Sequence, residues 1–361
     1  MLVFEIIVGL VILVLLVVAH ELGHAISARH SGVVVQEFGV GLPPMALKKK
    51  LKSGLLLTIN WLPLGGFVKL QGEYDEADKK GDYGAATFWQ KTKILFAGVI
   101  TNWLVAAVLL TVLALTGLPK VLPNQATISG DTTIISQPVE IATLTKDHSA
   151  EKAGLKVGDK IVRFDGQAVP TISRLIELSK QKTDQTVTVI YNRAGVEKSV
   201  KVALGEESAD GIFGAGLGQR ELIKATWSAP FVGLATTTQL TWVTIQGLGG
   251  LISSIFTSGL QAAGDSVTGP IGIIGTIFPS AVQGGLTQLV FLTAIISLSL
   301  AIMNILPIPA LDGGRWFTMV MFKLFKKRLT KDREEKIQAV GFYVLMSLIL
   351  LVTINDVTKL F

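Results

Sequence analysis

The sequence of 361 residues contains no cysteine, few charged side chains and only four histidines. Without cysteine there are no disulfides, iron–sulfur clusters or cysteine-ligated metal ions, so histidine and carboxylate side chains are the strong metal ligands that remain. Charged residues make up 17% of the chain, whereas 49% of its residues are hydrophobic. This composition is more apolar than soluble domains need for their cores and indicates a membrane protein. We therefore expect the lipid bilayer, and no nucleic acid, among its partners.

Four apolar stretches are long enough to cross a bilayer as helices. A cleaved signal peptide is disfavoured at the first stretch, because no basic residue precedes the apolar run and His20, Glu21 and His24 stand where a cleavage region would be. The spans that we expect are residues 1–30, 93–118, 287–315 and 338–355.

Lysine and arginine concentrate in two of the segments that connect these spans, residues 31–92 and 316–337. Basic residues in short connecting loops favour the cytoplasmic side of the membrane. Four spans with both basic loops in the cytoplasm then place the two termini, and the long segment 119–284, on the outer side.

Part of this outer segment, residues 130–205, has the patterns of a small α/β domain. Residues 186–191 and 198–203 alternate as strands do, and residues 171–182 are typical of a helix. The phrase AGLKVGDKIVRFDG at residues 153–166 places glycines at tight turns around a further strand and resembles a PDZ domain of the bacterial protease type. The alternative is another small α/β domain with glycine turns.

Residues 220–285 are weakly polar and rich in glycine and threonine. Such a segment forms amphipathic surface helices, a re-entrant element or an additional span. An additional span would invert the topology of everything that follows and would conflict with the charge pattern. We therefore interpret this segment as associated with the membrane without crossing it.

The first span ends in the sequence HELGH, which carries His20, Glu21 and His24. Residues four apart lie on one face of a helix, so the two imidazoles can bind one metal ion while Glu21 stands beside its open coordination position. This HExxH arrangement is typical of zinc-dependent hydrolysis, in which the glutamate is the general base. Ionisable residues inside a membrane are costly and indicate a functional site. The alternative is that the helix ends near Ala19 and the polar residues are interfacial.

Asp312 is the best candidate for a third ligand. It follows the third span, where Pro307 and Pro309 prevent a regular helix and Gly313 and Gly314 permit close backbone approach. Irregular backbone at membrane depth is tolerated where it lines a cavity. HELGH and Asp312 both fall at the cytoplasmic ends of their spans and can therefore meet. Alone, Asp312 would be interpreted as an Asp-Gly turn at the membrane surface.

Together, HELGH and the sequence NILPIPALDGG at residues 304–314 resemble the site-2 protease family of intramembrane zinc metalloproteases, in its bacterial PDZ-containing branch. Residues 60–73 are similar to the family's cytoplasmic β-hairpin, residues 98–102 to its GxxxN motif and residues 269–273 to its GPxGI motif. One departure is Val99, where family members often have proline.

The resemblance implies a role for each matching residue. His20, His24 and Asp312 would bind Zn²⁺, and Glu21 would be the catalytic base. Residues expected to contact substrate are Asn304, Asn102 and, in the hairpin, Gly66, Phe67 and Val68. The other two histidines, His30 and His148, are expected to be surface or loop residues rather than ligands.

The implied fold is a polytopic α-helical membrane protein of about four transmembrane helices, with an inserted extracytoplasmic α/β PDZ domain and a cytoplasmic membrane-associated β-hairpin. The implied function is cleavage of transmembrane segments of single-pass proteins, such as anti-sigma factors or remnant signal peptides, in regulated intramembrane proteolysis. The implied location is the bacterial cytoplasmic (inner) membrane, with the active site near its cytoplasmic side and a peptide C-terminus at the PDZ domain. The alternatives are a catalytically inactive PDZ scaffold and a metal-containing transporter, and the lack of inverted repeats disfavours the transporter.

Overall fold

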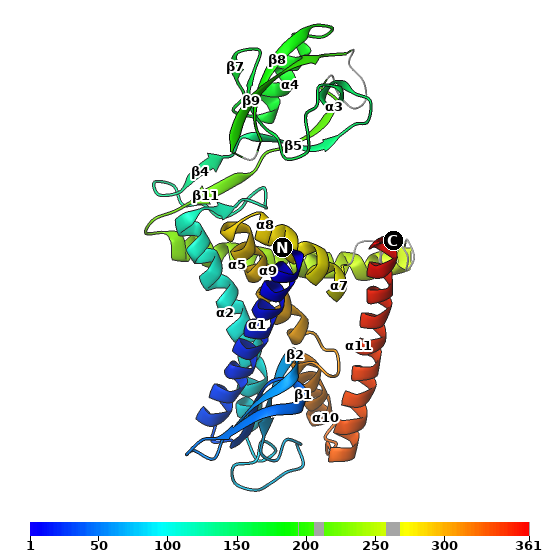
Figure 1. Cartoon of the computed structure of the whole chain (residues 1–361). Helices are drawn as coiled ribbons and strands as arrows, with labels where there is room; N and C mark the ends of the chain where they lie inside the picture. Colours follow the sequence, from blue (N-terminus) through cyan, green and yellow to red (C-terminus); the bar gives the residue numbers. More distant parts are fainter. Residues whose placement is uncertain (194, 206–212, 258–267, 361) are drawn as a thin grey trace. The chain divides into compact units, whose positions relative to one another are not determined.

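The computed structural model describes residues 1–193, 195–205, 213–257 and 268–360. The chain divides into two compact units, one formed by Met1–Leu113 with Pro230–Phe361 and the other by Ala114–Ala229. Among the described residues, four helices are long and apolar enough to cross a membrane (Figure 1). They are α1 (Leu2–His30), α2 (Phe88–Thr116), α9 (Leu286–Ile305) and α11 (Lys331–Leu360). The protein is thus a multi-pass membrane protein.

Helix α2 begins five residues before the span expected from the sequence, and its N-terminus shows why. The backbone N–H of Thr87 donates to Gln90 Oε1 at 2.8 Å, and the backbone N–H of Gln90 donates to the Thr87 hydroxyl at 3.3 Å. This reciprocal pair is a capping box, which satisfies donors that the first turn of a helix otherwise leaves free. Lys91 in this first turn forms an ion pair with Asp75, so its charge does not prevent the helix from starting there.

The segment 316–337, expected to be a loop, instead begins within a helix, α10 (Asp312–Leu324). Its apolar face packs into a small core in which Met319 is buried with Leu95 and Leu329, and Trp316 lies against them. The lysines that suggested a loop lie on the exposed side and beyond the helix end. Helix α11 likewise starts at Lys331, before the expected start of the fourth span at residue 338.

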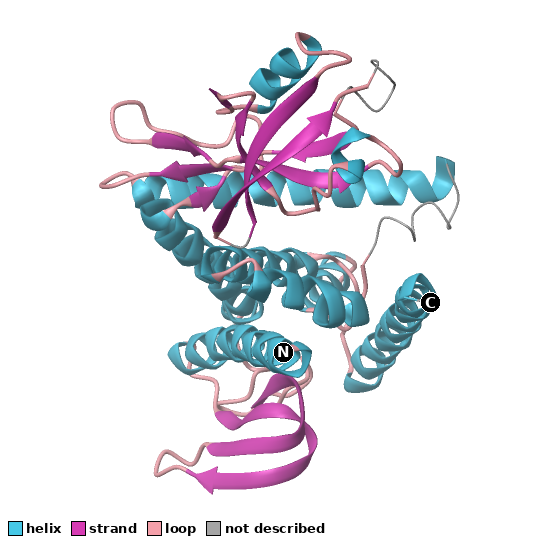
Figure 2. Cartoon of the chain, turned by 45° about the horizontal axis from the view of Figure 1, so that its top comes forward, coloured by secondary structure: helices cyan, strands magenta, loops and turns pink. Residues whose placement is uncertain are grey.

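Between α1 and α2 the chain forms an antiparallel hairpin of two long strands, β1 (Val35–Lys50) and β2 (Leu56–Leu70), drawn in magenta beside the N-terminal helix in Figure 2. The strands fold back on themselves. Residues 37–40 of β1 pair with residues 66–69 on one side and with residues 56–59 on the other. In the described part of the chain, the end of β2 therefore pairs on only one side and forms an edge of this sheet.

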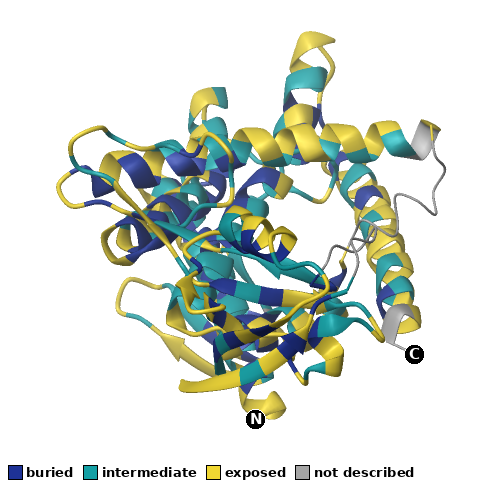
Figure 3. Ribbon diagram, turned by 90° about the horizontal axis from the view of Figure 1, so that it is seen from above, coloured by how far each residue is buried: buried dark blue, intermediate teal, exposed yellow. Residues whose placement is uncertain are grey.

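Helix α5 (Ala229–Thr257) belongs to the segment interpreted as membrane-associated, and it is not among the helices apolar enough to span. It runs across the picture in Figure 1, whereas α1, α2 and α11 run lengthwise. Its first half packs on α2, where Trp103 Nε1 donates to Thr241 Oγ1 at 3.0 Å. Beyond this contact, residues 242–254 are exposed or half-buried (Figure 3).

After residues 258–267, which lie outside the described residues, the chain forms three short helices, α7 (Pro270–Gly272), η1 (Ile273–Ile277) and α8 (Phe278–Gln283). Asp356 on α11 accepts the backbone N–H groups of Gly269 at 2.9 Å and of Gly272 at 2.8 Å. The C-terminal end of α11 is thereby attached to the GPIGI segment.

The unit Ala114–Ala229 is built on a six-stranded sheet with strand order β10-β5-β6-β8-β9 and β7 paired to β6. The elements of this sheet and its helices are β5 (Val139–Leu144), α3 (Ser149–Lys152), β6 (Lys160–Phe164), β7 (Gln167–Ala168), α4 (Ile172–Lys180), β8 (Thr186–Arg193), β9 (Val196–Ala203) and β10 (Ala215–Gly218). A second sheet has the order β3-β11-β4, with β3 (Leu118–Pro119), β4 (Thr133–Ser136) and β11 (Glu221–Lys224). Ile141, Ile161, Phe164, Leu175 and Val189 are fully buried between the main sheet and α4.

This unit is larger than the domain of residues 130–205 expected from the sequence. β10 and β11 lie beyond residue 205 and pair with β5 and β4 from the beginning of the unit. The expected turns are present: Gly154 and Gly158 have φ of 81° and 91°, a left-handed conformation that glycine adopts without steric cost.

Candidate metal centre

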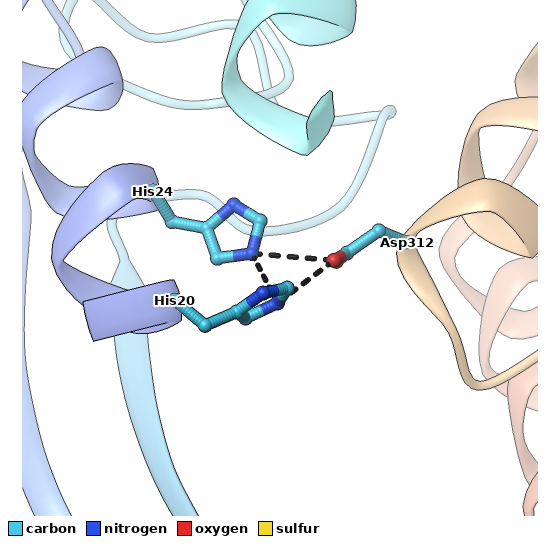
Figure 4. Close-up of side chains that lie close together, drawn as sticks. All are labelled: His20, His24 and Asp312. Atoms are coloured by element: carbon cyan, nitrogen blue, oxygen red, sulfur yellow. Dashed lines mark hydrogen bonds and ion pairs between the residues drawn. The ribbon is translucent and has the colours of Figure 1, made fainter. Parts of the chain in front are cut away.

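Two histidines and one aspartate converge where α1 approaches the start of α10 (Figure 4). The Nε2 atoms of His20 and His24 lie 3.1 Å apart. Oδ2 of Asp312 lies 3.1 Å from Nε2 of His20 and 3.3 Å from Nε2 of His24. Among the described residues, these three form the group whose donor atoms could hold one metal ion. The sequence analysis predicted the same three side chains.

The dimensions of this triangle suit zinc. Ligand bonds of about 2.0–2.1 Å in a tetrahedral site separate neighbouring donor atoms by about 3.3–3.4 Å. The observed separations of 3.1–3.3 Å are close to this value. Two imidazole nitrogens and one carboxylate oxygen also form a common catalytic donor set for zinc, with the fourth position open for water or substrate. The residues present therefore fit this ion.

His24 is oriented by the backbone of α2. Its Nδ1 donates to the carbonyl oxygen of Ile94 at 2.7 Å, which leaves the lone pair of Nε2 directed at His20 and Asp312. An outer hydrogen bond of this kind fixes the tautomer and ring orientation of metal-binding histidines. Nδ1 of His20 is buried without a partner among the described residues, so this ring lacks the outer hydrogen bond that His24 makes.

Glycines let α2 approach the two imidazoles closely. A Cβ atom added at Gly98 would lie 2.5 Å from Nε2 of His24 and 2.6 Å from Cε1 of His20. On α1, a Cβ atom added at Gly23 would lie 2.4 Å from the Thr101 hydroxyl of α2. Gly98, the first residue of the GxxxN motif, thus lies directly against the candidate ligands.

Asp312 is placed by a folded-back loop between α9 and α10. The loop begins where α9 ends at Ile305, shortly before the two prolines. Cβ atoms added at Gly313 and Gly314 would lie 2.2 Å and 1.9 Å from the carbonyl oxygens of Ile305 and Ile308. The loop therefore packs beneath the first turn of α10 at a distance that only glycine permits.

Glu21 lies beside the three candidate ligands and next to the edge of the hairpin. Glu21 and Val68 line the same cavity, and a Cβ atom added at Gly66 would lie 3.5 Å from the Cγ of Glu21. This cavity of about 120 Å³ lies between Glu21, His24, Asp312 and the hairpin edge, and it has room for water. Its lining residues are Glu21, His24, Val68, Leu70, Glu73, Tyr83, Ile94, Leu95, Asp312 and Arg315.

Of the five residues expected to contact substrate, Val68 lines this cavity, whereas Gly66, Phe67, Asn102 and Asn304 do not. The ring of Phe67 lies over Gly39 of the neighbouring strand. Asn102 is fully buried, and neither atom of its side-chain amide has a hydrogen-bond partner in the described part of the chain. Asn304 donates from its side chain to the Leu300 carbonyl of its own helix at 3.0 Å.

The remaining two histidines lie elsewhere. Nδ1 of the exposed His30 is 2.9 Å from the carbonyl oxygen of Ile26 in its own helix. His148 belongs to the unit Ala114–Ala229, where it packs against Gly214. Neither belongs to the described group of residues that could hold a metal ion.

The cavity also contains residues that the sequence analysis did not select. Tyr83 is 1% exposed, and burial is the main cause that raises the pKa of its phenol. Arg315 lies one helical turn after Asp312, and this i, i+3 spacing is a sequence signal by which Arg315 could have been selected as a residue of the site. Tyr83 and Glu73 lie in the irregular segment after the hairpin, where no periodicity reveals which side chains point inward.

Two histidines and an aspartate converge beside a small cavity, with a glutamate next to them, in a chain with four helices that can span a membrane. These features together are those of an intramembrane metallohydrolase. A comparison with known families agrees with this class: the model of Peptidase family M50 matches residues 8–348, and the chain belongs to that family. It is therefore a zinc metalloprotease of the site-2 type, with Zn²⁺ as its cofactor.

Relatives match over nearly the whole chain. A protein from Fusobacterium nucleatum, provisionally named a zinc metalloprotease, is 28% identical over 357 residues, covering 98% of this chain and 98% of its own. The zinc metalloprotease RasP from Geobacillus kaustophilus is 26% identical over 427 residues, covering 96% of each chain. Among solved structures, the PDZ domain of an SdrC-like protein from Listeria monocytogenes matches 26% of this chain and 93% of its own, with 21% identity and a TM-score of 0.21.

Proposed function

We propose that His20, His24 and Asp312 bind the zinc ion and that Glu21 is the general base for peptide hydrolysis within the membrane. The observation that carries this proposal is the triangle of donor atoms 3.1–3.3 Å apart with a carboxylate beside it. Zinc, when bound, lowers the pKa of water and polarises a carbonyl oxygen. The protein groups around it must then orient the substrate and move protons.

Glu21 is suited to carry the proton. It accepts one from the attacking water and delivers it to the nitrogen of the leaving amine, so that it begins and ends the cycle ionised. Val68 of the hairpin lines the same cavity, so the carboxylate lies beside the strand edge where the substrate is proposed to bind.

The substrate is proposed to bind as an extended strand along the end of β2. Residues 66–69 pair with β1 on one side, and Gly66 and Val68 lie next to Glu21. A strand added to a sheet edge gains backbone hydrogen bonds without requiring a particular side chain. A transmembrane segment must unwind to bind this way, since a helix uses its own carbonyl groups, so helix-destabilising residues should favour cleavage.

Asn102 and Asn304 are further proposed substrate contacts. Buried polar groups are almost always hydrogen-bonded, and the side chain of Asn102 has no partner among the described residues. Its amide therefore has unused hydrogen-bonding capacity, which a substrate peptide group that reaches it would satisfy. Asn304 stands one residue before the end of α9, at the entrance to the loop that carries Asp312.

We further propose the bacterial cytoplasmic (inner) membrane as the location, with the hairpin and α10 on the cytoplasmic side. The concentration of lysine and arginine in these segments supports this orientation. The unit Ala114–Ala229 would then be an extracytoplasmic PDZ domain that recognises the peptide C-terminus left by an earlier cleavage. Substrates would be single-pass proteins such as anti-sigma factors or remnant signal peptides, cut in regulated intramembrane proteolysis.

The test compares the wild-type protein with Glu21→Gln in cleavage of a model transmembrane substrate, with zinc content measured in parallel. Loss of the base should reduce cleavage by about 10²–10⁴-fold while zinc is retained. His20→Ala should lose zinc. Equal cleavage by wild type and Glu21→Gln would refute the mechanism, and zinc binding without cleavage of any substrate would favour the inactive scaffold.

A further inference from the structure

A buried ion pair lies one helical turn from Asp312. Nε of Arg315 donates to Oε1 of Glu334 at 3.0 Å, and the Arg315 guanidinium also donates to the carbonyl oxygen of Glu73. The side chains of Arg315 and Glu334 are only 20% and 3% exposed. Glu334 lies in the first turn of α11, so the pair connects α10 to the start of a transmembrane helix.

The same pair also holds the segment that follows the hairpin. Oε2 of Glu334 accepts the backbone N–H of Asp75 at 3.1 Å. The Arg315 guanidinium lies 4.8 Å from the ring centre of the buried Tyr83. Three segments distant in sequence therefore meet at one arginine and one glutamate.

The position of Arg315 in α10 gives the pair influence over Asp312. Asp312 begins the helix, and the two residues between it and Arg315 are Gly313 and Gly314, which have no side chains to hold the turn. Arg315 is thus the first side chain of α10 that can fix the rotation of its first turn. Residues three apart share a helix face, and both Asp312 and Arg315 line the cavity beside Glu21.

We infer that Arg315 and Glu334 are positioning residues, which aim the Asp312 carboxylate at His20 and His24 by anchoring the first turn of α10 to the base of α11. A second cavity, of about 500 Å³, lies along this anchor and is lined by Asp312, Arg315 and Glu334 among others. The pair acts on the metal ion through Asp312. The inference rests on the proposed function, because it takes Asp312 as a zinc ligand.

The experiment measures zinc affinity of the full-length protein in detergent, after removal of metal and by competition with a chromogenic chelator. Glu334→Gln should weaken zinc binding by about 10–100-fold, the range found when outer partners of metal ligands are removed. Arg315→Lys keeps the charge but not the planar fork that binds Glu334 and the Glu73 carbonyl together, and it should weaken binding in the same direction. The matched control is Glu335→Gln, because Glu335 is 47% exposed and pairs with Lys331 rather than with Arg315.

Thermal unfolding of the metal-free proteins separates positioning from folding. A purely structural pair would lower the unfolding temperature but leave the zinc affinity of the folded fraction unchanged. Zinc affinities of both Glu334→Gln and Arg315→Lys within about twofold of wild type would overturn the inference, against the loss expected from a displaced ligand. If Glu334→Gln does not fold, Arg315→Lys alone decides.

The outcome also distinguishes this inference from the proposed function. If His20→Ala bound zinc as tightly as the wild type does, the metal site itself would be refuted. Zinc bound through His20 but insensitive to Arg315 and Glu334 would refute only the positioning role.

Discussion

Replacing Gly98 by alanine tests how closely α2 must approach the metal centre. The added methyl group would lie 2.5 Å from Nε2 of His24 and 2.7 Å from Nε2 of His20. Ordinary contacts between such atoms are about 3.5 Å, so the rings or the helix must retreat by about 1 Å. His24 has little freedom to do so, because its Nδ1 is bound to the Ile94 carbonyl.

The expected consequence is large because metal sites tolerate little displacement. Ligand distances in working sites stay within about 0.2 Å of their preferred values, so a retreat of about 1 Å removes a nitrogen from bonding distance. Misplacement of this size typically costs about 100-fold in catalysis. Overpacking at a helix contact also destabilises the fold by about 1–3 kcal/mol.

The assay measures cleavage of a transmembrane substrate, zinc affinity and thermal unfolding for Gly98→Ala. Gly247→Ala in α5 is the matched control, since a Cβ atom added there has nothing within 4 Å. The control should retain activity and zinc. If Gly98→Ala lowered the unfolding temperature but bound zinc and cleaved substrate like the wild type, Gly98 would serve helix packing alone and the reasoning would be wrong.

Two further predictions concern the unit Ala114–Ala229. The Asp131 carboxylate accepts hydrogen bonds from the side chains and backbone N–H groups of Ser228 and Thr226. These bonds lower the pKa of Asp131 to about 2 from an ordinary value of 3.8. The stabilisation that the ionised carboxylate provides should therefore be complete above pH 4 and fade as the pH falls towards 2. Hydrogen exchange at the Thr226 and Ser228 amides should be faster in Asp131→Asn than in wild type at pH 5, and a difference that did not shrink towards pH 2 would contradict this. The Asp159 carboxylate, 1% exposed, is bound by the Arg193 guanidinium at 2.7 Å. Arg193→Met leaves this carboxylate without its partner and should destabilise the unit, measured by hydrogen exchange in the full-length protein. An unchanged exchange rate would show that the pair contributes nothing.

Local sequence patterns predicted the individual helices and strands of the protein better than they predicted which strands pair. The strand Lys160–Phe164 lies between the glycines that were expected to flank it, and the helix at residues 172–180 lies within the expected range. β10 escaped notice because its sequence, Ala-Gly-Leu-Gly, has neither alternation nor β-branched residues. It is a strand because β5, about 70 residues earlier in the chain, provides its backbone partners.

Only part of the candidate site could be predicted from the sequence: residues close together in one motif, and ligands for which the composition leaves few candidates. HELGH encodes two ligands and a base on one helix, and a chain without cysteine and with few intramembrane carboxylates leaves little choice for the third ligand. Tyr83, Glu73 and Glu334 could not be found in this way. They reach the site through contacts between the hairpin segment, α10 and α11, which no sequence period records.

Glycine is the residue type that brings these distant segments together. Gly98 brings α2 against the two imidazoles, Gly66 brings the hairpin edge against Glu21, and Gly313 and Gly314 bring the α9–α10 loop beneath Asp312. A methyl group at Gly98 would overlap a histidine ring, and one at Gly313 or Gly314 would overlap a backbone carbonyl. A polar cluster within an apolar protein gains little from the hydrophobic effect, so its geometry must be set by the fit of the surrounding backbone. Substitutions that enlarge these glycines should therefore damage zinc binding more than the removal of an equally buried apolar side chain elsewhere in the bundle.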